Sequence, residues 1–489
     1  AGTGGAAALL SGCSGGGAGG AGSAGRRSPA GAAASAATIG GRPAAAVQAF
    51  DPGQPFWLQG NFRPVATETT ATGLEVEGSL PPELTGLYVR NGSNSASVPG
   101  AHWFFGDGML HGIRLARGKA VWYRNRWVRT PLYEERRNFR GIPGKTENQS
   151  NVSVVAHAGA LLSLGEVGWP FRIDPSDLST AGAQSYGGRL GTAMTAHPKI
   201  DPTNGHMHAF GYDLLRPELS YYHVDDRGRL LANQVIPLPE VRMVHDFAIT
   251  ERDVVFWTGP VLFGPGKAAP KVPFHWDGTL PARIGVMPLG GPASAIRWVD
   301  FDPCYAYHGL NAWRDGNEVV LVVDRLPSSF ASADEIGPPG AIHEWRVDTS
   351  GAQLRFSDRK LSDTQMDLPA HDRRRTGRPV RHGWWASTRR GGTYGFEFSG
   401  LVHQDLRTGK EVRWDPGLME VPGEAFYVPA SDRAPEGEGW LLTLCYDRTR
   451  DRSHLAVLDA ADVAKGPVAR VRLPVRVPYG FHGWWLPDA

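Results

Sequence analysis

Short apolar runs alternate with turn-forming residues along the chain from Phe56 onward. They include "GALLSLGE", "RDVVFWTG", "NEVVLVVDRL" and "EGWLLTLCYDRTRDRSHLAVLDA". Apolar and β-branched runs of about four to eight residues, bounded by Gly, Pro, Asn or Asp, indicate β-strands. Because no long segment keeps a 3.6-residue apolar period, helices are expected only as a minority, in insertions between strands.

Two tight connections predict β-hairpins, namely "DDRGR" at 225–229 and "LRTGKE" at 406–411. Many short strands over roughly 440 residues favour an all-β fold, and above all a β-propeller whose blades are four-stranded meanders. A β-sandwich or a two-domain β protein is the structural alternative.

The composition agrees with strands and turns, because Gly (63 residues), Pro (38) and Trp (16) are all plentiful. Charged residues make up 20% of the chain and the net charge is +2, so no strong field points to nucleic acid as a partner. No apolar run reaches the roughly 18 residues that a membrane-spanning helix requires.

Residues 1–50 contain no Asp or Glu and are rich in Gly, Ala and Ser, which predicts a disordered leader before one catalytic domain at 51–489. The stretch "AAALLSGC" resembles the end of a lipoprotein signal in which Cys13 is lipidated, and "AGTGGAAALLSGC" resembles the tail of a twin-arginine signal. An exported, lipid-anchored protein is therefore predicted, with an organellar or cytoplasmic location as the alternative. Cys304 and Cys445 are expected to be buried small side chains.

Four histidines stand at the start of strand-like runs: His197 in "TAHPKIDP", His245 in "VHDFAIT", His308 in "YHGLNAW" and His482 in "FHGWW". Successive gaps of 48, 63 and 174 residues equal one, one and three blades if a blade takes about 60 residues. Equivalent positions on inner strands would meet at the propeller axis, where four imidazoles suit Fe, Cu, Zn or Ni. His382 shares the "HGWW" motif but lies out of phase, 74 residues after His308.

Three acidic residues occur in otherwise apolar strand settings: Glu166 in "LLSLGEVGWP", Glu424 in "VPGEAFYVP" and Asp367 in "QMDLPAHD". A metal-ligating imidazole usually donates its other ring N–H to such an acceptor, which fixes the tautomer. These carboxylates are therefore candidates for orienting the histidines, and a solvated turn carboxylate is the alternative for each.

Taken in order, these segments resemble the carotenoid cleavage oxygenase family from about Phe56 onward. "LPPELTGLYVRNGSNS" is similar to the family's opening, and "HWFFGDGMLHGIRL" to its HWFDGDGMxH segment. The segments "AHPKIDP", "VHDFAIT", "YHGLNAW" and "FHGWW" are similar to its four iron-histidine motifs. The resemblance implies a seven-bladed β-propeller, capped on one face by helical and loop insertions, with Fe(II) on the axis.

The resemblance also implies roles for individual residues. The four histidines of the motifs would hold Fe(II), with Glu166 orienting His245 and Glu424 orienting His482. Asp367 would orient His308, but relatives typically carry Glu there, so the shorter side chain raises the prospect of a bridging water. His382 falls where relatives carry an aromatic residue, and it is expected to be structural.

The implied reaction is scission of a C=C bond by O2 to give two carbonyl products. Phe104, Phe105, Trp384 and Trp385 are candidates for lining an apolar tunnel, or for packing in the core. Val152 stands where relatives often carry Thr, and we expect it to shape an open position on the iron.

The substrate expected from the resemblance is an apolar polyene, a carotenoid or apocarotenoid, taken up through peripheral contact with a membrane. Stilbene cleavers generally carry Lys at the position of Gly165, to bind the phenol oxygen. The alternatives are a stilbene-cleaving dioxygenase, a member of the family's isomerase branch and a non-catalytic binding propeller.

Overall fold

The computed structural model describes residues 51, 53–96, 102–137, 145–264, 272–331, 338, 340–390 and 396–488. The predicted leader at 1–50, with Cys13 in its lipoprotein-like segment, lies outside the described residues, so that prediction remains one. Within the described residues no helix is long and apolar enough to cross a bilayer.

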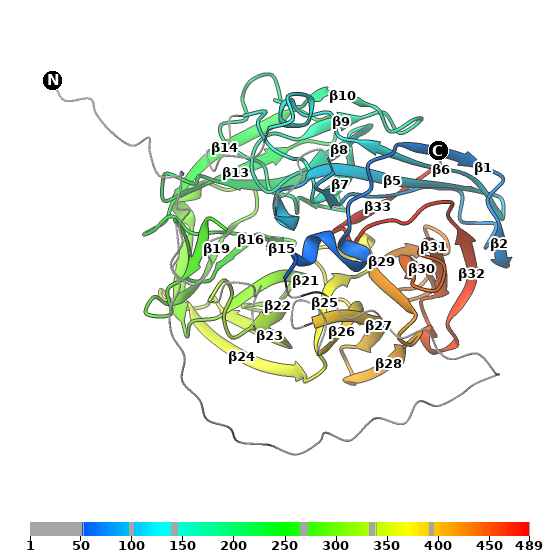
Figure 1. Cartoon of the computed structure of the whole chain (residues 1–489). Helices are drawn as coiled ribbons and strands as arrows, with labels where there is room; N and C mark the ends of the chain where they lie inside the picture. Colours follow the sequence, from blue (N-terminus) through cyan, green and yellow to red (C-terminus); the bar gives the residue numbers. More distant parts are fainter. Residues whose placement is uncertain are drawn as a thin grey trace, which may run out of the picture. The chain divides into compact units, whose positions relative to one another are not determined.

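Strands dominate the described part of the chain, which contains 33 of them and a single α-helix, α1 (Pro131–Glu134). The other helical segments are single 3-10 turns: η1 (Phe56–Leu58), η2 (Gly60–Phe62), η3 (Trp103–Phe105), η4 (Ala293–Ala295), η5 (Arg373–Arg375) and η6 (Val463–Lys465). The predicted minority of helix is confirmed. Figure 1 draws η1 and η2, in blue, across the centre of the ring.

Seven antiparallel sheets surround a common axis as the blades of a β-propeller, which confirms the predicted fold (Figure 1). From the innermost strand outward, blade I contains β33 (Gly483–Pro487), β3 (Gly86–Arg90), β5 (Asp107–Ala116), β6 (Lys119–Trp127) and β1 (Thr69–Thr72), with β4 (Ser93–Asn94) paired to β5. Blade II contains β7 (Ser153–His157), β8 (Ala160–Leu164), β9 (Phe171–Ile173) and β10 (Thr180–Ala183). Blade III contains β11 (Lys199–Ile200), β12 (Met207–Tyr212), β13 (Glu218–Val224) and β14 (Leu230–Pro237).

The remaining four blades follow in chain order. Blade IV contains β15 (Phe247–Ile249), β16 (Asp253–Thr258), β19 (Ala282–Pro288) and β20 (Arg297–Phe301), with a separate hairpin of β17 (Val261–Phe263) and β18 (Phe274–Trp276). Blade V contains β21 (Tyr305–Asp315), β22 (Glu318–Leu326), β23 (Ala341–Asp348) and β24 (Arg355–Ser362). Blade VI contains β25 (Met366–Ala370), β26 (His382–Arg390), β27 (Phe396–Asp405) and β28 (Lys410–Trp414). Blade VII contains β29 (Glu420–Pro429), β30 (Gly439–Asp447), β31 (Arg452–Asp459), β32 (Pro467–Arg472) and β2 (Val76–Gly78).

The apolar pattern of each strand follows its place in a blade. The second strand β22 reads "EVVLVVDRL" and is buried on both faces, because its blade is packed between two neighbours. The outermost strand β24 of the same blade reads "RFSDRKLS" and is largely exposed. Both predicted hairpins are present, and their turns contain Gly228 at φ +77° and Gly409 at φ +71°, a conformation that favours glycine.

The ring is closed by strands from distant parts of the sequence. In blade I, β33 pairs antiparallel with β3, placing Trp485 opposite Tyr88. In blade VII, β2 pairs with β32 and places Val76 opposite Val471. Both closing blades therefore combine early and late strands, which holds the two ends of the ring together.

The contacts between blades bury large apolar side chains, including two that the sequence analysis considered for a tunnel. Trp384 has no exposed surface, donates its indole N–H to the Ala460 carbonyl at 2.9 Å and stacks on Tyr427. Trp385 is equally buried and packs against Leu310 of blade V. Both belong to the core, which is the second of the two roles considered for them. Cys304 and Cys445 are buried free thiols, as expected.

Candidate metal centre

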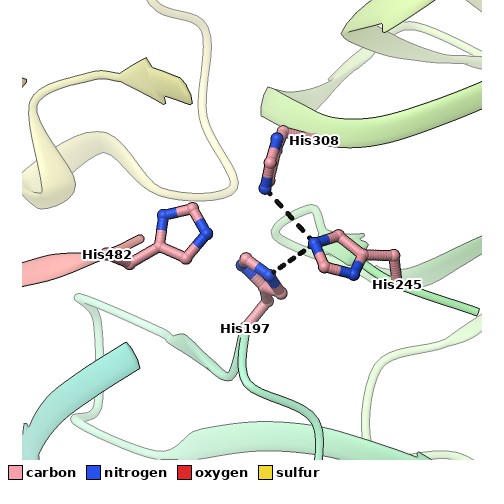
Figure 2. A group of neighbouring side chains, drawn as sticks. All are labelled: His197, His245, His308 and His482. Carbon is pink, nitrogen blue, oxygen red and sulfur yellow. Dashed lines mark hydrogen bonds between the residues drawn. The ribbon is translucent and has the colours of Figure 1, made fainter. Parts of the chain in front are cut away.

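Four imidazoles meet at the centre of the ring, each brought there by a different blade (Figure 2). His197 precedes β11, His245 precedes β15, His308 lies in β21 and His482 precedes β33. The blades concerned are III, IV, V and I, so the gaps of one, one and three blades inferred from the spacing are those of the structure. Each histidine thus stands at or near the start of an inner strand.

The ring nitrogens of the four histidines all lie within 4.8 Å of one another. The Nε2 atoms of His197 and His245 are 3.1 Å apart, and those of His245 and His308 are 3.3 Å apart (Figure 2). The ring of His482 lies 4.6 Å from that of His197 and 4.9 Å from that of His308, between centroids. All four rings are close enough for their nitrogens to bind one ion.

Three of the imidazoles donate a hydrogen bond from Nδ1 to a carboxylate. His245 donates to Glu166 at 2.8 Å, and His482 donates to Glu424 at 2.8 Å. Because a carboxylate only accepts, Nδ1 must carry the proton, and in the neutral ring Nε2 then presents its lone pair to the centre. The carboxylates therefore hold the rings in the tautomer that a metal requires.

The third pair, His308 and Asp367, is joined directly by a 2.7 Å hydrogen bond, so no bridging water is needed. The strand register shifts between Asp367 and Ala370, and Leu368 has φ +52°. The Leu368 N–H also donates to the Asp367 carboxylate at 2.6 Å. This bulge brings the shorter side chain within reach of the ring, which the sequence could not indicate.

Asp324, a residue that the sequence analysis missed, completes a small acidic group behind His308. Its Oδ1 accepts the His308 backbone N–H at 2.8 Å, and its Oδ2 is buried without a hydrogen-bond partner among the described residues. Burial, followed by the nearby Asp367 charge, raises the pKa of Asp324 well above its usual range. For Asp367, burial acts to raise the pKa, but the His308 ring outweighs it and keeps that pKa low. Of the two acids, Asp324 therefore holds a proton more readily than Asp367.

Burial also controls the charge of the imidazoles. It lowers the pKa of His197 well below its ordinary value, and the neighbouring rings lower it further. Burial lowers the pKa of His308 as well, although the Asp367 carboxylate offsets part of the effect. For His245, burial is outweighed by the Glu166 carboxylate, and the pKa is raised. Neutral imidazoles are the form that binds a cation.

Aromatic side chains lie beside the fourth histidine. Phe104 is partly buried and packs against Trp103 and Phe481, with centroid separations of 5.7 and 6.3 Å. Phe481 directly precedes His482. Phe105 is likewise half-buried. Phe104 therefore belongs to an aromatic cluster with Trp103 and Phe481, the residue before His482.

Two further positions named from the sequence adjoin the cluster. The Val152 carbonyl accepts the His482 backbone N–H at 3.0 Å, which places Val152 beside the fourth histidine. A Cβ added at Gly165 would lie 3.1 Å from Asn148 Oδ1 and 3.3 Å from Ser150 N. There is little room for a side chain at Gly165.

His382 lies outside the cluster. It begins β26, the second strand of blade VI, and its Nδ1 is 2.9 Å from Nε2 of His403. Its ring also packs near Trp384. The two "HGWW" segments therefore occupy different environments, and only His482 reaches the axis.

Comparisons with known proteins agree with this arrangement. The family profile described as "Retinal pigment epithelial membrane protein" matches residues 62–487. The carotenoid cleavage oxygenase of Mycobacterium tuberculosis (strain ATCC 25618 / H37Rv) is 33% identical, over 88% of this chain and 97% of its own length. The carotenoid 9,10(9',10')-cleavage dioxygenase 1 of Arabidopsis thaliana is also 33% identical, over 88% and 90%.

Among solved structures, the lignostilbene dioxygenase of Pseudomonas brassicacearum superimposes with a TM-score of 0.82 at 30% identity. That match covers 90% of this chain and 100% of the other. Both carotenoid and stilbene cleavers are thus among the relatives, which leaves the substrate open. The chain belongs to the carotenoid cleavage oxygenase family and is an oxygenase.

Proposed function

We propose that this chain is a non-haem Fe(II) dioxygenase that cleaves a C=C bond of a carotenoid or apocarotenoid. Both atoms of O2 would end in the two carbonyl products. The observation that carries the proposal is the convergence of His197, His245, His308 and His482, whose ring nitrogens all lie within 4.8 Å of one another. Imidazole ligands with open positions for O2 and substrate suit a redox-active iron ion.

The donor set fits such an ion in chemical terms. Among the described residues no carboxylate or thiolate joins the four nitrogens in the cluster, so the ligands would leave the metal charge uncancelled. Carboxylates on Nδ1 leave Nε2 of both His245 and His308 with a lone pair, and these two atoms, 3.3 Å apart, repel each other unless a cation lies between them. Bound Fe(II) would supply the redox chemistry by which O2 attacks the alkene.

The protein's own contribution is to hold the ligands and position the alkene. Glu166, Asp367 and Glu424 keep the ring tautomers fixed. Burial lowers the pKa of His197 and of His308, which keeps these two rings from taking up protons. The aromatic cluster of Phe104, Trp103 and Phe481 would pack against a hydrocarbon substrate. No side-chain acid or base is required, because the conjugated alkene supplies the electrons.

The preference for a polyene rests on Gly165. The lysine of stilbene cleavers has no counterpart here, and a side chain at this position would press on Asn148 and Ser150. Asn148 is itself engaged, donating to the Trp169 carbonyl at 3.1 Å and accepting from Ser150 N at 2.8 Å. A phenol would therefore lack a charged partner at this point. Stilbene cleavage is the second candidate, favoured by the 30% identity to a lignostilbene dioxygenase.

The test has two parts. Metal analysis of purified protein should find about one iron per chain, and its absence would favour a non-catalytic propeller. Iron-loaded protein is then incubated under 18O2 with β-carotene, apocarotenals and hydroxystilbenes, and product masses are read. We expect paired carbonyl products from a polyene, each with one labelled oxygen. Efficient cleavage of stilbenes with no turnover of polyenes would refute the substrate assignment.

A further inference from the structure

The carboxylate of Asp246 lies directly behind the imidazole cluster and is not a candidate ligand. It follows His245 in the chain and is buried, with 1% of its surface exposed. Oδ1 accepts from Lys199 Nζ at 2.7 Å and from the Phe247 backbone N–H at 2.8 Å. Oδ2 accepts from the Gly309 backbone N–H at 3.0 Å. One side chain therefore satisfies three donors.

These donors lie next to three different histidines. Lys199 is two residues after His197 on the inner strand of blade III, and Gly309 directly follows His308 on the inner strand of blade V. Asp246 itself comes between His245 and the inner strand of blade IV. A single buried carboxylate thus connects the three strands that carry three of the four imidazoles.

The fourth strand is held in a similar way by Glu424. Its Oε1 accepts from the His482 ring, and its Oε2 accepts from the Gly483 backbone N–H at 2.7 Å. In both His-Gly segments the glycine N–H donates to a carboxylate, and neither site has room for a side chain. A Cβ would lie 2.9 Å from the Trp257 ring at Gly309 and 2.9 Å from Tyr88 Oη at Gly483.

We propose that Asp246 is a positioning residue of the metal centre, which fixes the spacing of His197, His245 and His308 and thereby sets metal affinity. The inference rests on the metal site of the proposed function. Asp246 is hydrogen-bonded to none of the four imidazoles. It acts through the backbone N–H groups of Phe247 and Gly309 and through the Lys199 side chain. A carboxylate is needed because three donors converge on it, and an amide offers only one acceptor oxygen.

Asp253 provides a matched control in the same blade. Its side chain is also nearly buried, accepts from Arg314 at two distances of 2.6 Å and accepts from Thr250 Oγ1 at 2.6 Å. It joins the β15–β16 turn to the end of β21, away from the residues that flank the histidines. Asp253→Asn therefore loses a comparable buried ion pair at the end of β21 that lies away from His308.

The experiment compares wild type, Asp246→Asn and Asp253→Asn after loading with Co(II), whose visible spectrum reports its coordination. Metal Kd is measured by chelator competition, and Tm without metal is measured in parallel. We expect both variants to have a lower Tm than wild type. Only Asp246→Asn should shift the Co(II) bands and weaken binding, on the order of ten-fold or more, as changes behind metal ligands do.

An Asp246→Asn protein with the wild-type spectrum and Kd would overturn the inference, as would equal losses of affinity in both variants. If Asp246→Asn does not fold, Lys199→Met removes one of the three bonds and leaves both backbone bonds, and an unchanged Co(II) spectrum would then refute the proposal. Wild type that binds no metal would instead refute the proposed function.

Discussion

Glu424→Gln tests whether a carboxylate behind the cluster sets the metal affinity. Glu424 is 8% exposed and accepts two hydrogen bonds, from the His482 ring at 2.8 Å and from Gly483 N at 2.7 Å. Glutamine keeps one acceptor oxygen, so its NH2 group must face one of the two donors. If it faces His482 Nδ1, the ring can accept only by moving its proton to Nε2, which then points at the metal position.

The size of the effect follows from the loss of one hydrogen bond to a charged group, about 1.5–3 kcal/mol. Since each 1.4 kcal/mol is a tenfold change, metal affinity should fall about 10- to 100-fold. Chelator competition gives the Kd, and C=C cleavage at saturating iron separates weaker binding from a damaged site. We expect cleavage to recover in part when iron is raised.

Glu420→Gln is the control, because Glu420 lies on the same strand and accepts from His454 Nε2 at 2.7 Å, a histidine outside the four-imidazole cluster. It should lower Tm without changing the metal Kd. Our reasoning fails if Glu424→Gln binds metal like wild type, or if the two variants lose affinity equally.

Three further outcomes are expected. His482→Ala should lose metal and activity, whereas His382→Tyr should keep both, as judged by metal content and product formation. Asp324→Asn should change the free energy of unfolding by no more than about 1 kcal/mol, because the protonated acid is already neutral. Asp324→Ala should lower the free energy of unfolding by about 1–3 kcal/mol, because it leaves the His308 N–H unpaired. Urea unfolding measures both changes. Burial, helped by nearby histidines, lowers the pKa of His208 to about 3, so below pH 6.5 the unfolded chain takes up a proton that the folded protein excludes. Stability should therefore fall by about 2 kcal/mol from pH 6.5 to pH 5 through this group, and His208→Gln should remove that share of the slope in urea unfolding.

The meeting of the four histidines at the axis could be predicted because each stands at or near the start of an inner strand. The sequence pattern of such a position is a histidine followed by an apolar run. Because each blade takes about 60 residues, the number of residues between two histidines gives the number of blades between them. The spacing favoured His482 over His382, and the order of motifs in the family that the chain resembles decided between them. The two share the "HGWW" motif but stand in different strands of their blades.

The acidic residues that hydrogen-bond to the histidines were harder to predict, because their roles depend on pairings between distant strands. Nothing local in "VVDRL" shows that Asp324 meets the backbone of His308. The direct bond of Asp367 depends on a bulge in which Leu368 takes φ +52°, and no pattern in "QMDLPAHD" indicates it. The burial of Trp384 and Trp385 likewise depends on the neighbouring blades.

The pairing of β33 with β3 has a consequence for assembly. His482 reaches the axis only with β33, and nearby Arg90 donates to the Pro478 carbonyl across 388 residues of sequence. A chain whose other blades are formed but whose junction is open would present three imidazoles. A metal that binds the four-imidazole state and not the three-imidazole state would stabilise the closed junction by RT ln(1 + [M]/Kd). The concentration of free metal would then determine how long the ring stays closed, as well as whether the protein is active.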